Sequence, residues 1–178
     1  MSAPLASRKV LFVIAPSRFR DEELLEPKKV LEAAGARTAI ASTTHGIAHG
    51  MLGATVMPQL LVKDAKAADY DAVVVVGGMG SPEHLWEHRP LHALLQDRAK
   101  AGKVVGAICL SGAVVGKAGI AKGKRATCWA DPRAVAALEA GGATYEKSGV
   151  VVDGNLVTAD GPESARRFGE ALVKALGG

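Results

Sequence analysis

The sequence is poor in cysteine and has no long hydrophobic run. Its 178 residues include two cysteines, Cys109 and Cys128, which form neither a disulfide framework nor a metal-binding spacing. No apolar run approaches the about 18 residues that a membrane-spanning helix needs. Residues 1–9 also lack the apolar core of a secretory signal. We therefore expect a cytoplasmic protein that has no membrane partner.

Aromatic residues and excess charge are also scarce. The chain has two Trp, two Tyr and three Phe, and its net charge of +4 is spread along the sequence. Without a basic block or interleaved basic and aromatic residues, the composition argues against a nucleic-acid partner. Hydrophobic residues make up 48% and charged residues 22%, which is typical of a globular chain that can bury a full core.

Short apolar runs alternate with helical segments along the whole chain. The clearest strands are predicted at residues 9–15, 36–42, 71–76 and 104–108, and the clearest helices at 21–35, 90–101, 132–140 and 162–176. Strands that are apolar throughout are typical of a parallel sheet covered on both faces. We therefore predict an α/β fold, a single-domain three-layer αβα sandwich with a flavodoxin-like, mainly parallel sheet over residues 1–178, in which residues 1–8 are flexible.

Other local patterns refine this prediction. Asp21 is expected to cap the first helix, and Pro27 to kink or restart it. Glycines interrupt residues 43–61, which indicates a hairpin-like excursion, and residues 150–158 are typical of a hairpin around an Asp-Gly turn. The last helix carries one apolar stripe, which consists of Ala165, Phe168, Leu172 and Leu176.

Cys109 lies between the strand at 104–108 and a helical segment. In such a nucleophile elbow the side chain stands above the carboxyl edge of the sheet, near the free N–H groups of the following helix. This environment favours the thiolate, which is the nucleophilic form of cysteine. Gly77 and Gly78 follow the neighbouring strand and allow close backbone approach at the same edge. The alternatives are a cysteine that packs as a small hydrophobe and a plain tight turn.

Five segments together resemble the ThiJ/PfpI superfamily, which includes the Parkinson-disease-associated protein deglycase and the PfpI intracellular peptidases. They are FRDEELLEP at residues 19–27, VGG at 76–78, AIC at 107–109, and the stretches 119–127 and 150–155. The resemblance implies a class I glutamine-amidotransferase-like fold. It also implies a homodimer or a higher homo-oligomer.

The resemblance further implies a catalytic pair, with Cys109 as nucleophile and Glu23 against its sulfur. The adjacent Glu22 is the alternative match, and a first-turn helix acid is the alternative role for Glu23. An ionised carboxylate would repel a thiolate, so Glu23 helps only when it is protonated. Backbone N–H groups of Gly78 and Leu110 are expected to hold an oxyanion. The candidates for the pocket wall are Gly77, Trp129 and Cys128, the last being either a resolving thiol or a buried apolar residue.

The chain departs from the family pattern at two histidine positions. Leu110 stands where the peptidase members carry a histidine, and Trp129 stands near the place of another in deglycase-like members. No Cys–His pair is therefore evident. Three of the histidines, His84, His88 and His92, recur every four residues. Because Pro90 interrupts their spacing, we expect a solvated face, with a surface metal or subunit contact as the alternative.

These observations predict a cysteine-dependent enzyme, a glyoxalase- or deglycase-like hydrolase or lyase that needs no metal or organic cofactor. By the resemblance, its substrate is a small reactive carbonyl or a glycated adduct, which Cys109 attacks while Glu23 handles the proton. One alternative is a redox sensor or stress-protective protein in which Cys109 is oxidised. The other is a PfpI-type intracellular cysteine peptidase, which Leu110 disfavours.

Overall fold

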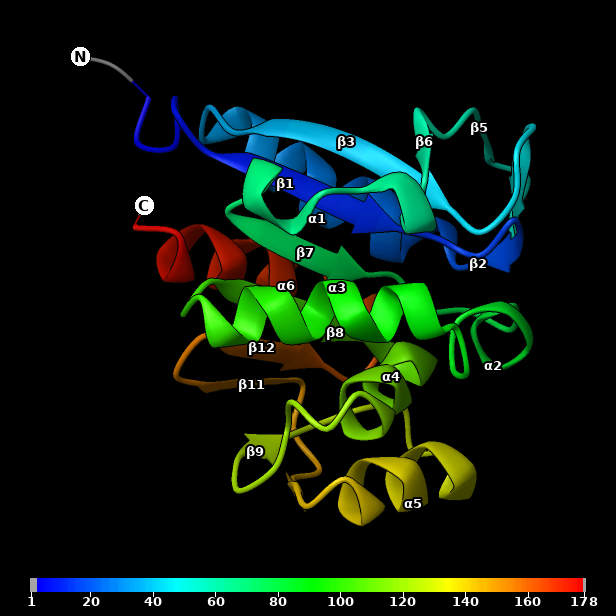
Figure 1. Cartoon of the computed structure of the whole chain (residues 1–178), viewed down its shortest axis with the longest axis vertical. Coiled ribbons are helices and arrows are strands. Elements are labelled where there is room, and N and C mark those ends of the chain that lie inside the picture. The colour runs from blue at the N-terminus through cyan, green and yellow to red at the C-terminus, as the bar shows by residue number, and fades with distance from the viewer. Residues whose placement is uncertain (1–2, 178) are drawn as a thin grey trace.

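A seven-stranded sheet lies at the centre of the structure (Figure 1), a computed structural model that describes residues 3–177. The strand order is β11-β12-β8-β7-β1-β3-β6, and every neighbouring pair is parallel except β11 and β12. The strands are β1 (Lys9–Val13), β3 (Arg37–Ser42), β6 (Leu60–Leu61), β7 (Ala72–Val75), β8 (Val104–Ile108), β11 (Val150–Asp153) and β12 (Leu156–Ala159).

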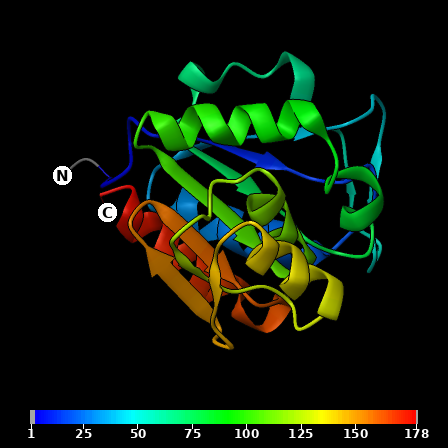
Figure 2. The same cartoon turned by 60° about the horizontal axis from the view of Figure 1, so that its bottom comes forward.

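Helices cover both faces of this sheet. In Figure 2, α3 lies on one side of the sheet, and α1 and α6 lie together on the other. The helices are α1 (Asp21–Ala33), α2 (Ser81–His84), α3 (Arg89–Lys100), α4 (Gly112–Lys117), α5 (Pro132–Ala140) and α6 (Ala165–Ala175). This arrangement confirms the predicted α/β sandwich with a mainly parallel sheet.

Short strands and single turns connect these elements. β2 (Ser17–Phe19), β4 (Ala48–Gly50) and β5 (Thr55–Val56) form a small sheet in which β4 and β5 pair antiparallel, as the hairpin-like excursion predicts. β9 (Arg125–Ala126) pairs with β10 (Thr144–Tyr145). The 3-10 turns are η1 (Val62–Asp64), η2 (Ala67–Asp69), η3 (Cys109–Ser111) and η4 (Pro162–Ser164).

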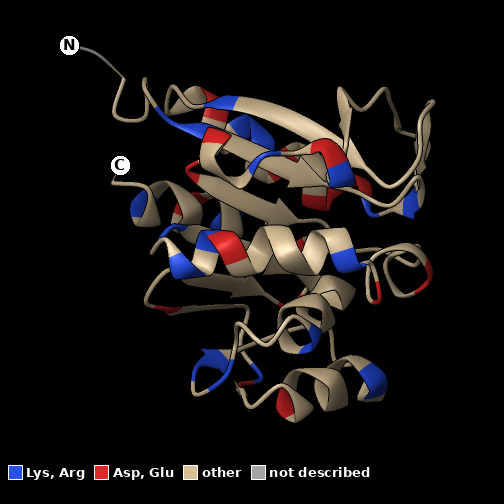
Figure 3. Cartoon of the chain, in the orientation of Figure 1, with Lys and Arg blue, Asp and Glu red and all other residues tan. Residues whose placement is uncertain are grey.

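The two central strands β7 and β8 supply small and β-branched residues to the core between sheet and helices. All residues of β7 and β8 are buried, and neither strand carries a charged residue, so both are tan throughout in Figure 3. A Cβ atom on Gly106 of β8 would lie 3.1 Å from the ring of Phe168 and 3.0 Å from Leu172. Glycine at this position therefore lets α6 pack closely on the sheet. Both side chains are fully buried, which confirms the predicted apolar stripe.

The structure bears on three local expectations and corrects two of them. Leu5 is fully buried and its N–H donates to the Ala34 carbonyl, so Leu5 packs against the end of α1, and the flexibility of residues 1–8 stays a prediction. Residues 1–2 lie outside the described residues. Asp21 makes no cap, because its carboxylate accepts the N–H groups of Leu52 and Ala54 at 3.1 and 2.8 Å. The helix continues through Pro27 without a restart.

Charged residues of both signs are interspersed along the ribbon in Figure 3. Within the described part of the chain, every helix is too short or too polar to cross a bilayer.

We predict that Phe168→Ala lowers the free energy of unfolding by about 3–5 kcal/mol, because it opens a cavity between α6 and β8. Urea denaturation measures this loss. Arg166→Ala on the exposed side of the same helix is the matched control and should stay within about 0.5 kcal/mol of the wild type. Equal effects of the two substitutions would contradict this packing.

Candidate active site

Cys109 occupies a strained backbone position at the carboxyl edge of the sheet. It follows β8 directly and begins the 3-10 turn that leads into α4. Its φ is +61°, and Arg18, at the same edge, is the only other non-glycine residue of 3–177 with a positive φ. Such a conformation costs on the order of 1–3 kcal/mol and persists only where the surroundings enforce it. This geometry is that of the predicted nucleophile elbow.

Glu23, on the first turn of α1, has a fully buried side chain. Its Oε2 atom accepts a hydrogen bond from the Gly77 N–H at 2.9 Å. The thiol of Cys109 lies next to the same carboxyl group, whose Oε1 has no hydrogen-bond partner within the described residues. Glu22 instead pairs with Arg20 at 2.8 Å. The structure therefore brings Glu23, and not the adjacent Glu22, to Cys109.

The protonation of this pair follows from its burial. Desolvation raises the pKa of Glu23 to about 8, against the opposing hydrogen bonds of Cys109 and Gly77. Because Oε2 is held as an acceptor by the Gly77 N–H, the proton belongs on Oε1, the atom without another partner. A carboxylic acid in this state can donate to the sulfur. Near neutral pH, Glu23 is therefore protonated, which is the state that the sequence analysis requires if it is to assist Cys109.

The environment of the thiol differs from the sequence expectation. Desolvation first, and then the Glu23 carboxylate, raise the pKa of Cys109 well above its ordinary value, while the N–H groups of Leu110 and Gly78 lower it. α4 has only six residues, so its N-terminus contributes little against this burial. A thiolate is thus favoured only while the proton remains on Glu23 and the two N–H groups face the sulfur.

Gly77 and Gly78 form the turn opposite the elbow. A Cβ atom on Gly77 would lie 2.5 Å from Glu23 Oε2 and 2.7 Å from Cys109 Cβ, so only glycine fits there. Gly78 has φ +108° and directs its N–H to the sulfur, as Leu110 does from the elbow. The two expected oxyanion donors are therefore brought to Cys109 from different strands.

A cavity of about 140 Å³ opens above Cys109. Its lining consists of Arg20, Glu23, Met51, Gly78, Met79, Cys109, Leu110, Trp129 and Pro162. Trp129 is half exposed, as a pocket-wall residue requires. Gly77 lies behind the lining, where it holds Glu23.

Cys128 does not line the cavity, contrary to the expectation from the sequence. Its side chain is fully buried against Gly112, and burial raises the pKa of its thiol to about 12. This environment is typical of a cysteine that packs as a small hydrophobe.

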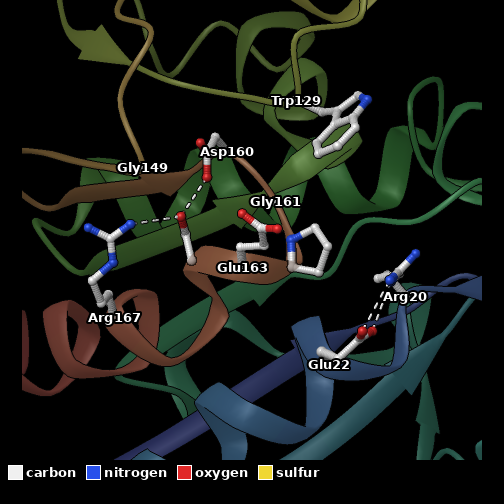
Figure 4. Close-up of a pocket in the computed structure, with 10 residues that line it drawn as sticks. Arg20, Glu22, Trp129, Gly149, Asp160, Gly161, Glu163 and Arg167 are labelled. Atoms are coloured by element: carbon white, nitrogen blue, oxygen red, sulfur yellow. Dashed lines mark hydrogen bonds and ion pairs between the residues drawn. The ribbon is translucent and has the colours of Figure 1, made fainter.

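A wider cavity of about 790 Å³ adjoins the first and shares Arg20, Trp129 and Pro162 with it. Figure 4 shows side chains from the start of α1, from Trp129 and from the segment after β12 around this space. The Ser164 hydroxyl donates to Asp160 at 2.6 Å and accepts from Arg167 at 3.2 Å. These polar residues were not identified from the sequence. Their position directly after a parallel strand, at the ligand-binding edge, is the signal that indicates them.

The three regularly spaced histidines do not share one helix face. His84 contacts the Ser17 hydroxyl at 3.4 Å, His88 accepts the Leu91 N–H at the start of α3, and His92 lies 2.8 Å from the Trp86 carbonyl. All three are partly exposed and each contacts a group of the protein, so they do not form the one solvated face that the spacing predicts. Within residues 3–177, no group of three His, Cys, Asp or Glu side chains is arranged to hold a metal ion.

We predict that Glu23→Gln changes how stability depends on pH. The folded pKa of Glu23, about 8, exceeds its ordinary value of 4.5, so its contribution to stability is full below pH 4.5 and is lost as the pH rises to about 8. Glutamine keeps the acceptor for Gly77 and the donor for sulfur but does not titrate. Urea unfolding at pH 5 to 8 should therefore show the variant gaining on the wild type by up to about 1.4 kcal/mol per pH unit. Parallel stability curves would contradict the buried acid.

Comparisons with known proteins agree with this architecture. The family model described as "DJ-1/PfpI family" matches residues 8–175. An uncharacterized protein of Methanocaldococcus jannaschii is 47% identical over 97% of this chain and 84% of its own length. The crystal structure of a ThiJ/PfpI domain protein from Brachyspira murdochii superposes with a TM-score of 0.88, at 36% identity, over 94% of this chain and 95% of that one.

Two more distant relatives carry names that describe activities. A glutathione-independent glyoxalase of Caenorhabditis elegans is 27% identical over 97% of this chain and 91% of its own length. A deglycase of Pyrococcus abyssi is 27% identical over 93% of this chain and 98% of its own length. With the elbow, the buried glutamate and the sheet order already in place, the match over nearly the whole chain means that this protein belongs to the DJ-1/PfpI family.

Proposed function

We propose that the protein is a cysteine-dependent enzyme that acts on reactive carbonyls, of the glyoxalase or deglycase type. The observation that carries this proposal is the contact of the buried Glu23 carboxyl group with the Cys109 thiol, between the N–H groups of Gly78 and Leu110. The names of the Caenorhabditis elegans and Pyrococcus abyssi relatives support the same substrate class.

The first step is addition of sulfur to the aldehyde carbon of a 2-oxoaldehyde such as methylglyoxal. The Sγ–C bond forms, the carbonyl π pair moves to oxygen, and the Gly78 and Leu110 N–H groups stabilise that oxygen. The thiol proton reaches the oxygen through the Glu23 carboxyl group. The product of this step is a hemithioacetal on Cys109.

In the second stage two protons move: the proton on the former aldehyde carbon goes to the neighbouring keto carbon, and the hydroxyl proton of the hemithioacetal goes to the keto oxygen. The Glu23 carboxyl group carries them by giving its own proton to the keto oxygen as it accepts the proton from carbon, and it is protonated again at the end. This shift oxidises one carbon and reduces the other, and it leaves a thioester of the 2-hydroxy acid on Cys109. Water then breaks the S–C bond, which restores the thiol and releases lactate. The atoms and electrons balance with water as the only co-reactant, so no cofactor enters the scheme.

The adjoining cavity gives this site room for a larger substrate. Its volume of about 790 Å³ and its charged lining suit the amine-bearing part of a glycated adduct, while the small cavity holds the carbonyl carbon. On a hemiaminal adduct, sulfur would instead displace the amine: the Sγ–C bond forms as the C–N bond breaks, and the thiol proton reaches the leaving amine through the Glu23 carboxyl group. The product is the same hemithioacetal, which then follows the second stage and hydrolysis.

The peptidase and redox-sensor functions receive less support. No histidine lines the Cys109 cavity within the described residues, so the Cys–His pair of a peptidase has no counterpart there. Oxidation of Cys109 remains the second candidate, because the same N–H groups and a protonated Glu23 suit the oxygens of a sulfinate. The homo-oligomeric state and the cytoplasmic location stay predictions.

We predict that the purified protein converts methylglyoxal to lactate without added metal or cofactor. Cys109→Ser should lower the rate to background, and Glu23→Gln should lower kcat by about 100-fold or more, because glutamine cannot transfer the proton. Cys128→Ala is the matched cysteine control and should retain activity. In the wild type, the rate should fall as the pH passes about 8, where Glu23 loses its proton.

Equal inactivity of the wild type and both site variants would refute the carbonyl activity. Mass spectrometry after peroxide treatment then tests the redox alternative, which requires oxidation at Cys109 and its suppression in Glu23→Gln.

A further inference from the structure

Two buried serines, Ser81 and Ser111, link the two halves of the site. The Ser111 hydroxyl donates to the Val76 carbonyl at 2.6 Å, and the hydroxyl oxygens of Ser81 and Ser111 lie 2.7 Å apart. A hydroxyl group has one proton, and that of Ser111 goes to Val76, so Ser81 must be the donor to Ser111. The direction of the chain is therefore fixed, from Ser81 through Ser111 to Val76.

This series of hydrogen bonds joins three segments of the protein that meet at Cys109. Val76 directly precedes Gly77 and Gly78, Ser111 directly follows Leu110, and Ser81 begins α2. The Ser81 N–H also donates to the Gly78 carbonyl at 3.1 Å. The serines thus connect the turn that presents the Gly78 N–H to the elbow that presents the Leu110 N–H.

Few other hydrogen bonds join these two segments. The pairing of β7 with β8 ends at Val75 and Ala107, one strand position short of the site. Beyond that point, within the described residues, the other hydrogen bond between the elbow and the segment that follows the Gly78 turn is from Trp86 Nε1 to the Leu110 carbonyl, at 2.9 Å. Both serines are fully inaccessible to solvent, so water cannot replace the bonds they make.

We propose that Ser81 and Ser111 are positioning residues that set the spacing of the Gly78 and Leu110 N–H groups around the Cys109 sulfur. The sulfur depends on both donors, since burial and Glu23 otherwise oppose the thiolate. Only the part of the proposal that concerns turnover rests on the proposed function. The reactivity of the thiol itself does not require a substrate.

Because the hydrogen bonds run from Ser81 through Ser111 to Val76, loss of one serine hydroxyl should have a different effect from loss of the other. Ser111→Ala leaves both the Ser81 hydroxyl and the Val76 carbonyl without partners, whereas Ser81→Ala leaves the bond from Ser111 to Val76 intact. The double variant leaves only the carbonyl unpaired, so its effect should be no larger than that of Ser111→Ala alone.

The test is the rate at which iodoacetamide alkylates Cys109 between pH 6 and 10, with peptide mass mapping to separate it from Cys128. We expect Ser111→Ala to slow alkylation on the order of tenfold and to move the pH profile upward. Ser81→Ala should have a smaller effect, less than about threefold. If the wild type converts methylglyoxal, Ser111→Ala should lower kcat more than it raises KM.

Ser42→Ala is the matched control, because the Ser42 hydroxyl is buried and donates to the Ile14 carbonyl at 2.8 Å, away from Cys109. It should lower the melting temperature but leave the alkylation profile unchanged. A Ser111→Ala profile identical to that of Ser42→Ala would overturn the proposal, and so would a double variant that is alkylated more slowly than Ser111→Ala. If Ser111→Ala does not fold, the alkylation profile of the double variant tests the proposal instead, because that variant has no unpaired Ser81 hydroxyl. A shifted profile in a protein that shows no turnover would uphold the positioning role and refute the proposed function.

Discussion

One proton, shared between a buried carboxyl group and a buried thiol, sets the conditions that the rest of the site must meet. Glu23 is fully buried and Cys109 nearly so, and desolvation disfavours the charged form of each. Two negative charges cannot coexist there, so the pair holds at least one proton over the neutral range. The Gly77 N–H then decides where that proton goes, because it occupies Oε2 and leaves Oε1 as the oxygen that can carry the proton.

This arrangement requires close backbone approach, which explains the strain at the site. The turn after β7 carries glycine where any Cβ would collide with Glu23 or Cys109. Cys109 itself adopts φ +61°, which a free chain avoids. The parallel pairing of β1, β7 and β8 brings the start of α1, the glycine turn and the elbow to one edge. The sheet thereby offsets a local cost that the elbow alone could not sustain.

Those parts of the site that follow single strands were predictable from the sequence. The apolar run 104–108 and the glycines after 71–76 place Cys109 and Gly78 at one edge, because parallel strands end together. Met51 was not found, since it reaches the site from a loop whose path local patterns do not determine. The polar residues around Asp160 were missed although they directly follow a parallel strand, because the pattern places them at the edge without showing which pocket they line. Asp21 shows the same limit, because its partners Leu52 and Ala54 lie far along the chain. Burial, which reverses the expected pKa direction of Cys109, likewise arises only on folding.

Leu110 and Trp129, which replace histidines of the family pattern, change which groups near Cys109 can carry a proton. A histidine beside the sulfur would act as a base that titrates near neutrality. Leu110 and Trp129 cannot do this, and they make the small cavity more apolar. Desolvation by burial is the main cause that raises the pKa of Glu23, to about 8. With no histidine in the cavity lining of the described residues, Glu23 is the acid beside the sulfur, and it keeps its proton below about pH 8.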